Sequence, residues 1–202
     1  MTAVLDNATA RSVIARGIDP IARGLLKIGL TADAVTWIGA LAVVAVATFV
    51  IAPGHFVVGA VLYGLLGLSD LLDGTMARLS GTSGPWGAFL DSTLDRIVDA
   101  SMLIAITLFY VTHPAQSWIV PVALVALVAG QVTSYIRARA EALGATCHVG
   151  LAERAERSVI IWLALISSQL DANIVPFALV LLAIVSVITV VQRLMHVKKQ
   201  LA

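Results

Sequence analysis

Apolar segments about as long as a bilayer is thick recur along nearly the whole chain, and they restrict it to an α-helical membrane fold. Of its 202 residues, 59% are hydrophobic and 12% are charged, and the mean hydropathy is +0.97. Soluble globular domains are only about 45–50% apolar. An α-helix needs about 20 apolar residues to cross the hydrocarbon core. We therefore expect six transmembrane helices, at 33–53, 55–79, 86–112, 116–142, 153–170 and 174–195.

The links between these segments are short and rich in residues that break helices. Pro53 and Gly54 separate the first two segments, and a glycine-rich stretch separates the second from the third. Such residues mark turns, and a chain of this length corresponds to one domain. We predict a single all-α membrane domain over 1–202, with the transmembrane bundle at 33–195.

The segment 10–30, before the first span, has an amphipathic pattern. The apolar residues of one helical face are Ile14, Ile18, Ile21, Leu25 and Ile28, and the basic residues opposite are Arg16, Arg23 and Lys27. This pattern is typical of a helix that lies in the membrane interface. An ordinary amphipathic core helix is the alternative, and the chain offers little soluble core for such a helix to cover. We expect an interfacial helix here.

The basic residues predict the orientation in the membrane. All thirteen Lys and Arg precede the first span or lie around the links and ends that an even number of spans places on one side. Basic residues favour the cytoplasmic side. Both termini and the active site are therefore predicted to be cytoplasmic, in a multi-pass protein of the plasma membrane. The net charge of +1 does not indicate a nucleic-acid partner, and the single Cys147 cannot form an internal disulfide.

Aspartates within the second and third spans carry the functional argument. They are Asp70, Asp73, Asp91, Asp95 and Asp99. One charged Asp at the centre of a membrane helix costs about 2.5–3.5 kcal/mol, so these residues must face a wet or metal-filled interior. Asp70 and Asp73 are i,i+3, and Asp91 and Asp95 are i,i+4, so each pair shares a helix face. The short link makes the two helices antiparallel, so we expect the two pairs to meet.

Carboxylate-rich sites suit hard cations such as Mg²⁺ or Mn²⁺. Two such ions can bridge a diphosphate and stabilise the attacking and leaving oxygens. Gly74 would allow close approach to the helix, and Arg78 could hold a phosphate bidentately. Two alternatives remain from spacing alone. The acids could form a buried ion network with Arg78 and Arg96, or they could line the ion pathway of a cation transporter.

Residues 70–95 read DLLDGTMARLSGTSGPWGAFLDSTLD. This stretch resembles the signature of the CDP-alcohol phosphotransferases, D-x-x-D-G-x-x-A-R-x₈-G-x-x-x-D-x-x-x-D, and matches it at every fixed position. The resemblance also covers the six-span plan and the interfacial N-terminal helix. It makes the transporter a remote alternative, because a transporter leaves Arg78 and the fixed glycines without an evident function.

The resemblance implies roles for individual residues. Asp70, Asp73, Asp91 and Asp95 would bind two divalent ions, and Asp95 would also be the general base that takes the proton of the acceptor hydroxyl. Gly74 and Arg78 would contact the CDP part of a CDP-lipid, with Ser83 or its neighbours closing over it. The resemblance also implies a homodimer.

The segment Thr31 to Thr36, TADAVT, resembles the nucleotide-contacting T-P-N-x-x-T segment of the same family. Here Ala32 replaces the usual Pro, and Asp33 replaces the usual Asn. Asp33 and Thr36 are therefore predicted to contact the CDP-lipid. Asp33 or Thr31 could equally cap the first transmembrane helix, and both functions can coexist.

Four arginines at the cytoplasmic ends of three spans are candidates for binding a phosphorylated acceptor: Arg137, Arg154, Arg157 and Arg193. Fixed guanidinium groups recognise phosphate well. Alternatively, these residues are topology determinants and contacts for anionic lipid headgroups. The tryptophans lie mostly near span ends, as expected of interface anchors.

The stretches SYIRARAEA at 134–142, ERAER at 153–157 and VQRL at 191–194 resemble the actinobacterial phosphatidylinositol phosphate synthases of the family. The first basic position is usually Lys there, so Arg137 is a departure that keeps the charge. The resemblance implies transfer of the phosphatidyl group from CDP-diacylglycerol to 1D-myo-inositol 3-phosphate, with CMP as the second product. The alternative acceptor is glycerol 3-phosphate, which would make the chain a phosphatidylglycerophosphate synthase.

Overall fold

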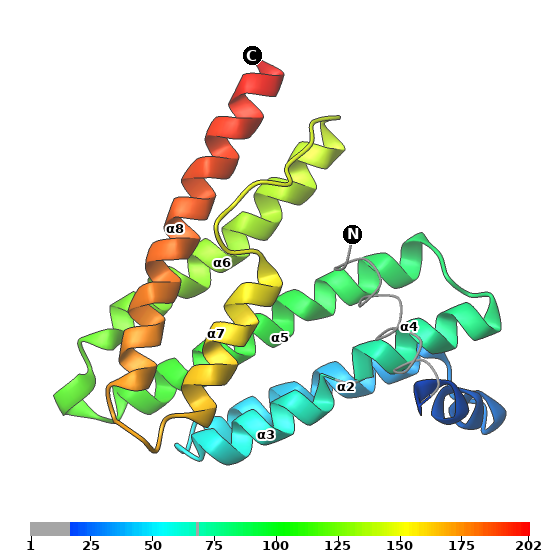
Figure 1. Ribbon diagram of the computed structural model, residues 1–202, viewed down its shortest axis with the longest axis horizontal. Helices are drawn as coiled ribbons and strands as arrows, with labels where there is room; N and C mark the ends of the chain where they lie inside the picture. The colour runs from blue at the N-terminus through cyan, green and yellow to red at the C-terminus, as the bar shows by residue number, and fades with distance from the viewer. Residues whose placement is uncertain (1–16, 68) are drawn as a thin grey trace, which may run out of the picture. The chain divides into compact units, whose positions relative to one another are not determined.

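The computed structural model describes residues 17–67 and 69–202, and within these residues it contains helices and no strand (Figure 1). Residues 17–27 form the first described helix. The helices that follow are α2 (Ala32–Val46), α3 (Phe56–Leu66), α4 (Ser69–Ser80), α5 (Pro85–Val111), α6 (Ile119–Ala142), α7 (Arg154–Ile166) and α8 (Ile174–Leu201). A π-helical turn, Ala47–Ile51, extends α2, and a 3₁₀ turn, Pro114–Gln116, precedes α6. The all-α prediction is confirmed for this part of the chain.

Four helical stretches of the described chain are long and apolar enough to cross a membrane. They are Ala32–Ile51, Phe56–Ser80, Ile119–Ala142 and Ile174–Leu201. Helix α5 has the length, 27 residues, but carries Asp91, Asp95, Arg96 and Asp99. Helix α7 has only 13 residues, about 20 Å at 1.5 Å per residue, against a hydrocarbon core of about 30 Å. The expected span at 153–170 is therefore a shorter helix than the sequence pattern indicated.

The chain divides into two compact units, residues 1–43 with 64–97, and residues 44–63 with 98–202. In the first unit, the helix at 17–27 packs through the fully buried Ala22 against Ala32, Val35 and Met76. On the same helix Ile21 is 55% exposed, and Ile28, directly after the helix, is 74% exposed. These side chains are available to an apolar environment. The part of the predicted interfacial helix at 10–16 lies outside the described residues.

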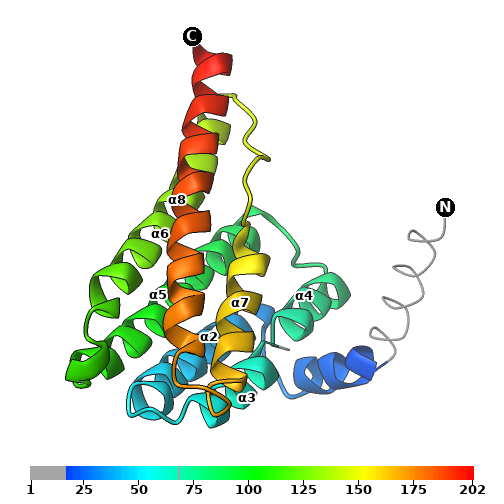
Figure 2. The same ribbon diagram turned by 60° about the vertical axis from the view of Figure 1, so that its left-hand side comes forward.

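In the second unit, α6 and α8 lie side by side, and α7 packs on α8 (Figure 2). Small buried residues permit this close packing, for example Ala140 on α6 and Ala183 on α8. Side chains of α8 bind the loop from 143 to 153 through hydrogen bonds. Gln200 is hydrogen-bonded to both the backbone N–H and the carbonyl of Thr146, and Gln192 accepts the N–H of Leu151 at 3.1 Å.

Candidate functional site

Most of the predicted nucleotide-contacting residues and metal ligands of the first unit line one cavity of about 330 Å³. Helix α2, helix α4, the loop after it and the start of α5 each contribute to its wall. The lining includes Asp33, Thr36, Asp70, Asp73, Gly74, Arg78, Ser83 and Asp91. The structure thus brings together all five residues predicted to contact the CDP-lipid and three of the four predicted metal ligands.

Asp73 is the buried carboxylate of this cavity, with 8% of its surface exposed. Thr36 on α2 donates its hydroxyl to Asp73 Oδ2 at 2.6 Å, across a sequence separation of 37 residues. The same hydroxyl oxygen lies 3.1 Å from the carbonyl of Ala32, so the contact with Asp73 is the shorter one. A hydrogen bond to a charged acceptor is short and strong. Thr36 therefore orients the carboxylate and joins α2 to α4.

Gly74 and Arg78 form an open part of the same wall. A Cβ atom built on Gly74 would have Arg78 Nη1, at 3.9 Å, as its nearest neighbour, so no other side chain packs against this point of α4. Arg78 Nη2 donates to Thr75 Oγ1 at 2.8 Å, which holds the guanidinium on its own helix. A guanidinium has five N–H donors. Arg78 can therefore keep this bond and still bind a phosphate in the cavity.

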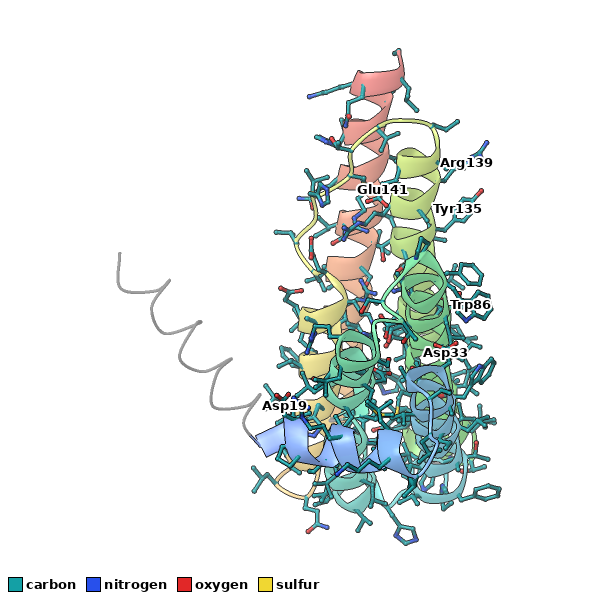
Figure 3. The ribbon with its side chains drawn as sticks, turned by 90° about the vertical axis from the view of Figure 1, so that its right-hand side faces the viewer. Asp19, Asp33, Trp86, Tyr135, Arg139 and Glu141 are labelled. Atoms are coloured by element: carbon teal, nitrogen blue, oxygen red, sulfur yellow. The ribbon has the colours of Figure 1, made fainter. Side chains whose placement is uncertain are left out.

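The start of α2 shows the contacts of the TADAVT segment. Thr31 caps the helix, because its Oγ1 accepts the N–H of Ala34 at 3.2 Å. Asp33 has a different contact: its Oδ2 accepts the indole N–H of Trp86 at 2.8 Å (Figure 3). Trp86 lies at an unspecified position of the signature, so the sequence pattern gave it no function beyond a membrane-interface anchor. Its side chain, 61% exposed, holds a predicted nucleotide-contacting residue in place.

The fourth predicted metal ligand, Asp95, lies one turn beyond Asp91 on α5 and is partly buried, but it is not among the residues that line the cavity. As placed, the described residues contain no group of three or more His, Cys, Asp and Glu side chains that could hold a metal ion. The donor set nevertheless suits a hard cation, since three carboxylates face one cavity and oxygen ligands are those that Mg²⁺ and Mn²⁺ prefer.

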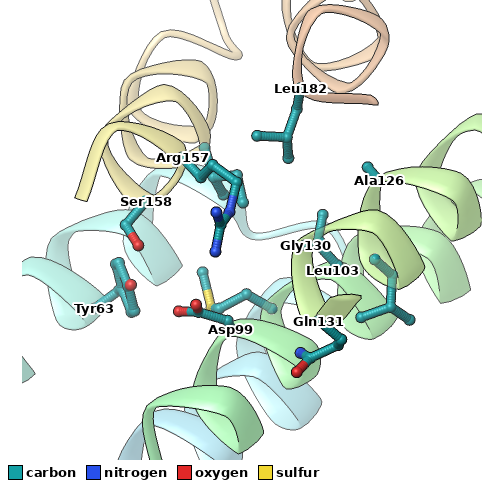
Figure 4. A pocket seen from close by; sticks show the side chains of 12 residues that line it. Tyr63, Asp99, Leu103, Ala126, Gly130, Gln131, Arg157, Ser158 and Leu182 are labelled. Atoms are coloured by element: carbon teal, nitrogen blue, oxygen red, sulfur yellow. The ribbon is translucent and has the colours of Figure 1, made fainter. Parts of the chain in front are cut away.

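The four arginines predicted to bind the acceptor lie in the second unit and have different surroundings. Arg137 forms an exposed ion pair with Glu141 of the same helix at 3.0 Å. Arg154 pairs with Asp99 at 3.4 Å. Arg157 is one of the residues that line the small cavity shown in Figure 4. The structure therefore does not gather all four side chains around one open pocket.

Arg157 and Arg193 meet at one residue of α6, Thr133. Arg157 Nη1 donates to the Thr133 hydroxyl and to the carbonyl of Ala152, both at 3.2 Å. Arg193 donates from Nη1 to the Thr133 carbonyl at 2.6 Å and from Nε to the Val149 carbonyl at 2.8 Å. Both arginines therefore fasten the loop 143–153 to the helices. No sequence pattern singled out Thr133, whose contacts come from residues distant in the chain.

Comparisons with known proteins agree with the signature. The family model of the CDP-alcohol phosphatidyltransferases matches residues 29–198. The phosphatidylinositol phosphate synthase of Streptomyces avermitilis is 37% identical over 204 residues, covering 97% of this chain and 84% of the relative. Among solved structures, the phosphatidylinositol phosphate synthase of Mycobacterium tuberculosis with CDP-DAG bound is 41% identical, with a TM-score of 0.87 over 91% of this chain and 94% of that one. The same enzyme in complex with manganese and citrate has a TM-score of 0.85 and 40% identity, covering 89% of this chain and 88% of that one.

Proposed function

This chain belongs to the CDP-alcohol phosphatidyltransferase family, and from that membership we propose that it is a phosphatidylinositol phosphate synthase. It transfers the phosphatidyl group of CDP-diacylglycerol to 1D-myo-inositol 3-phosphate and releases CMP. The relatives that support this activity match the chain over almost its whole length. Within the protein itself, the supporting observation is the cavity of the first unit, where predicted nucleotide-contacting residues and predicted metal ligands face the same space.

The donor lipid is bound through its cytidine diphosphate part. Arg78 supplies N–H donors for a phosphate, and Gly74 leaves the helix surface bare so that the diphosphate can approach it. Asp33, held by Trp86, and Thr36, held against Asp73, contact the nucleotide. Ser83 lies in the loop that borders the cavity. CDP-DAG is the molecule bound in the solved structure of the M. tuberculosis enzyme, which supports the same donor here.

Asp70, Asp73, Asp91 and Asp95 hold two divalent ions, Mg²⁺ or Mn²⁺. When bound, these ions neutralise the diphosphate and stabilise charge on the attacking and leaving oxygens. Without a cation, the carboxylates repel one another, so we expect them to draw together when an ion binds. The manganese in the solved M. tuberculosis structure supports the use of a divalent ion. Asp95 takes the proton from the acceptor hydroxyl as that oxygen attacks the β-phosphorus, and CMP leaves.

The acceptor carries its own phosphate, and the arginines of the second unit bind that phosphate. Arg157 and Arg193 each use some of their N–H donors on protein oxygens, and the fork of five donors leaves others for a phosphate. Arg137 and Arg154 are the other two arginines that bind the acceptor phosphate in this proposal. The relatives are phosphatidylinositol phosphate synthases, which favours inositol phosphate over glycerol 3-phosphate as the acceptor.

We also propose that all six helical segments form one transmembrane domain, with the helix before α2 in the membrane interface. Both termini and the active site face the cytoplasm of a plasma-membrane protein, and the enzyme forms a homodimer. The exposed Ile21 and Ile28 support the interfacial position, and the distribution of Lys and Arg supports the orientation.

CMP release by the purified protein tests the proposal. CDP-diacylglycerol and Mg²⁺ are supplied with inositol phosphate, free inositol or glycerol 3-phosphate in parallel. Release with inositol phosphate alone is the expected result. Release with glycerol 3-phosphate instead would keep the chemistry and replace the acceptor, and no release with any acceptor would contradict the proposed reaction.

A further inference from the structure

Asp99 follows Asp95 by four residues on α5 and lies outside the family signature, so neither the motif nor the reaction as proposed gives it a function. Within the second unit, Asp99 lies against the start of α7. Its Oδ2 lies 3.4 Å from Nε of Arg154, the first residue of α7, and the two side chains are 19% and 32% exposed. The ion pair between Arg137 and Glu141 joins two residues of one helix at 42% and 48% exposure. The Asp99 pair is more sheltered, and it connects two different helices.

The first turn of α7 contains two arginines and one acid. Arg154 and Arg157 lie at the end of the helix where the macrodipole is positive, which disfavours cations, and Glu156 accompanies them there. Its N-cap residue, Glu153, makes no side-chain capping hydrogen bond. Arg157 is also 93% buried, since only 7% of its surface is exposed, and a buried guanidinium without a counter-charge is costly. A carboxylate opposite this turn compensates both effects.

Asp99 is that carboxylate. It lines a small cavity together with Arg157, Tyr63, Gln131 and Ser158, and it is the one acidic residue among the described residues of that lining. Figure 4 shows the Arg157 guanidinium pointing across this space toward the side of Asp99, with Tyr63 and Gln131 at the edges. The cavity measures about 20 Å³, which is room for about one water molecule. A polyol ring does not fit in this space, so the cavity itself is not where the ring of the acceptor binds.

We propose that Asp99 is a positioning residue for acceptor recognition: its carboxylate holds Arg154 and Arg157 at the start of α7 in the arrangement that binds the acceptor phosphate. The proposal deepens the proposed function and rests on it. Asp99 then follows the predicted base, Asp95, by four residues in the sequence of α5. Asp99 is accordingly not a further metal ligand, although its spacing continues the series of Asp91 and Asp95.

The test compares Asp99→Asn with the wild type, using CDP-diacylglycerol, Mg²⁺ and inositol phosphate. Because the amide lacks the charge that orients two guanidiniums, we expect the KM for inositol phosphate to rise about tenfold. The KM for CDP-diacylglycerol and the Mg²⁺ concentration for half-maximal rate should change by less than about twofold. Asp99→Glu, which restores the charge, should recover much of the acceptor affinity. Asp171→Asn, a carboxylate loss in an exposed turn, is the matched control and should leave all three values unchanged.

A shifted Mg²⁺ requirement in Asp99→Asn would overturn the proposal, since it would make Asp99 a metal ligand. An unchanged KM for inositol phosphate would also overturn it. Arg154→Gln and the double variant provide a second measurement if Asp99→Asn does not fold. Arg154→Gln should raise the acceptor KM with no change in Mg²⁺ dependence, and the double variant should be no worse than the more impaired single variant. Additive effects would contradict a shared function.

A readout without turnover separates this proposal from the proposed reaction. Thermal stabilisation of the full chain by inositol phosphate alone, without CDP-diacylglycerol, should be lost in Asp99→Asn and kept in Asp171→Asn. If the wild type releases CMP with inositol phosphate but Asp99→Asn binds it normally, only the positioning function fails. If the wild type uses no inositol phosphate, the proposed function itself fails.

Discussion

The two compact units use their charged side chains in opposite ways. In the first unit, Asp70, Asp91 and Arg78 are exposed around a cavity of about 330 Å³. In the second unit, Arg157 and Arg193 are 7% and 4% exposed, and protein oxygens accept their N–H groups. A site for a charged nucleotide can remain open because the ligand supplies the missing counter-charge. A buried guanidinium must instead be satisfied by the protein.

Arginines that are predicted to bind a ligand can therefore also stabilise the fold. Arg193 holds the carbonyls of Val149 and Thr133, and Gly150 beside it has φ of +144°. A Cβ at Gly150 would lie 2.5 Å from Thr189 Cγ2, so the loop approaches α8 as closely as only glycine allows. The proposed acceptor binding and the observed loop anchoring therefore involve the same side chain.

The largest effect is expected on the reaction rate, from a substitution in the first unit. Asp95→Asn removes the proposed base, and loss of general-base catalysis costs about 10²- to 10⁴-fold in rate. CMP release should fall to that extent while CDP-diacylglycerol binding is largely kept, as measured by equilibrium binding of the labelled lipid. Substantial activity in this variant would mean that another group accepts the proton.

In the second unit, Arg193→Met is expected to act on stability before chemistry. The substitution removes the donor to the loop carbonyl of Val149, at about 1–3 kcal/mol, whereas the Thr133 carbonyl loses an extra bond and keeps the one within α6. The free energy of unfolding in detergent should fall by about 1–3 kcal/mol. Arg137→Met is the matched control, and because its ion pair is exposed, a change below about 1 kcal/mol is expected. Equal losses in the two variants would contradict the structural function of Arg193.

Thr36→Val tests how the donor cavity is organised. Valine has the shape of threonine but cannot donate to Asp73, and a hydrogen bond to a charged group contributes about 1.5–3 kcal/mol. The rate with saturating substrates should fall by at least about tenfold, and a higher Mg²⁺ concentration should be needed. Thr48→Val is the control, since Thr48 donates only to a carbonyl of its own helix. Normal kinetics in Thr36→Val would show that Asp73 needs no orienting partner.

The smallest effect is expected for Gly74→Ala, which should change protein stability and donor affinity in opposite directions. Alanine is favoured over glycine within a helix by up to about 1 kcal/mol, and a Cβ at Gly74 meets no atom closer than 3.9 Å. Gly74→Ala should therefore be slightly more stable than the wild type, yet bind CDP-diacylglycerol more weakly because the methyl group enters the cavity. Gly24→Ala, at a helical glycine with nothing within 4 Å, should gain stability without losing affinity. Equal donor KM values in the two variants would remove Gly74 from the donor site.

The lengths of the apolar segments, the turn residues between them and the spacing of the aspartates predicted much of the fold. The breaks at Pro53–Gly54 and after Ser80 follow from glycine and proline, and the described helix boundaries agree with most of the predicted segments. The end of α7 at Ile166 was not predicted, although polar residues, Ser167, Ser168 and Gln169, follow it and the backbone turns at Ser167. Spacing of i,i+3 and i,i+4 predicted which aspartates share a helix face, while the family resemblance implied the contacts of Asp33, Thr36 and Ser83.

Partners distant in the chain were decided by the tertiary structure. Thr36 meets Asp73 across 37 residues, Trp86 meets Asp33 across 53, and Arg193 meets Thr133 across 60. Local spacing determines which side chains share a face of one helix, so the helices, the acidic signature and the chemistry that the signature implies were predictable from the amino-acid sequence. Which oxygen satisfies a particular hydroxyl, indole or guanidinium depends on how helices pack, and packing also separated the arginines into an exposed one, a paired one and two that hold a loop.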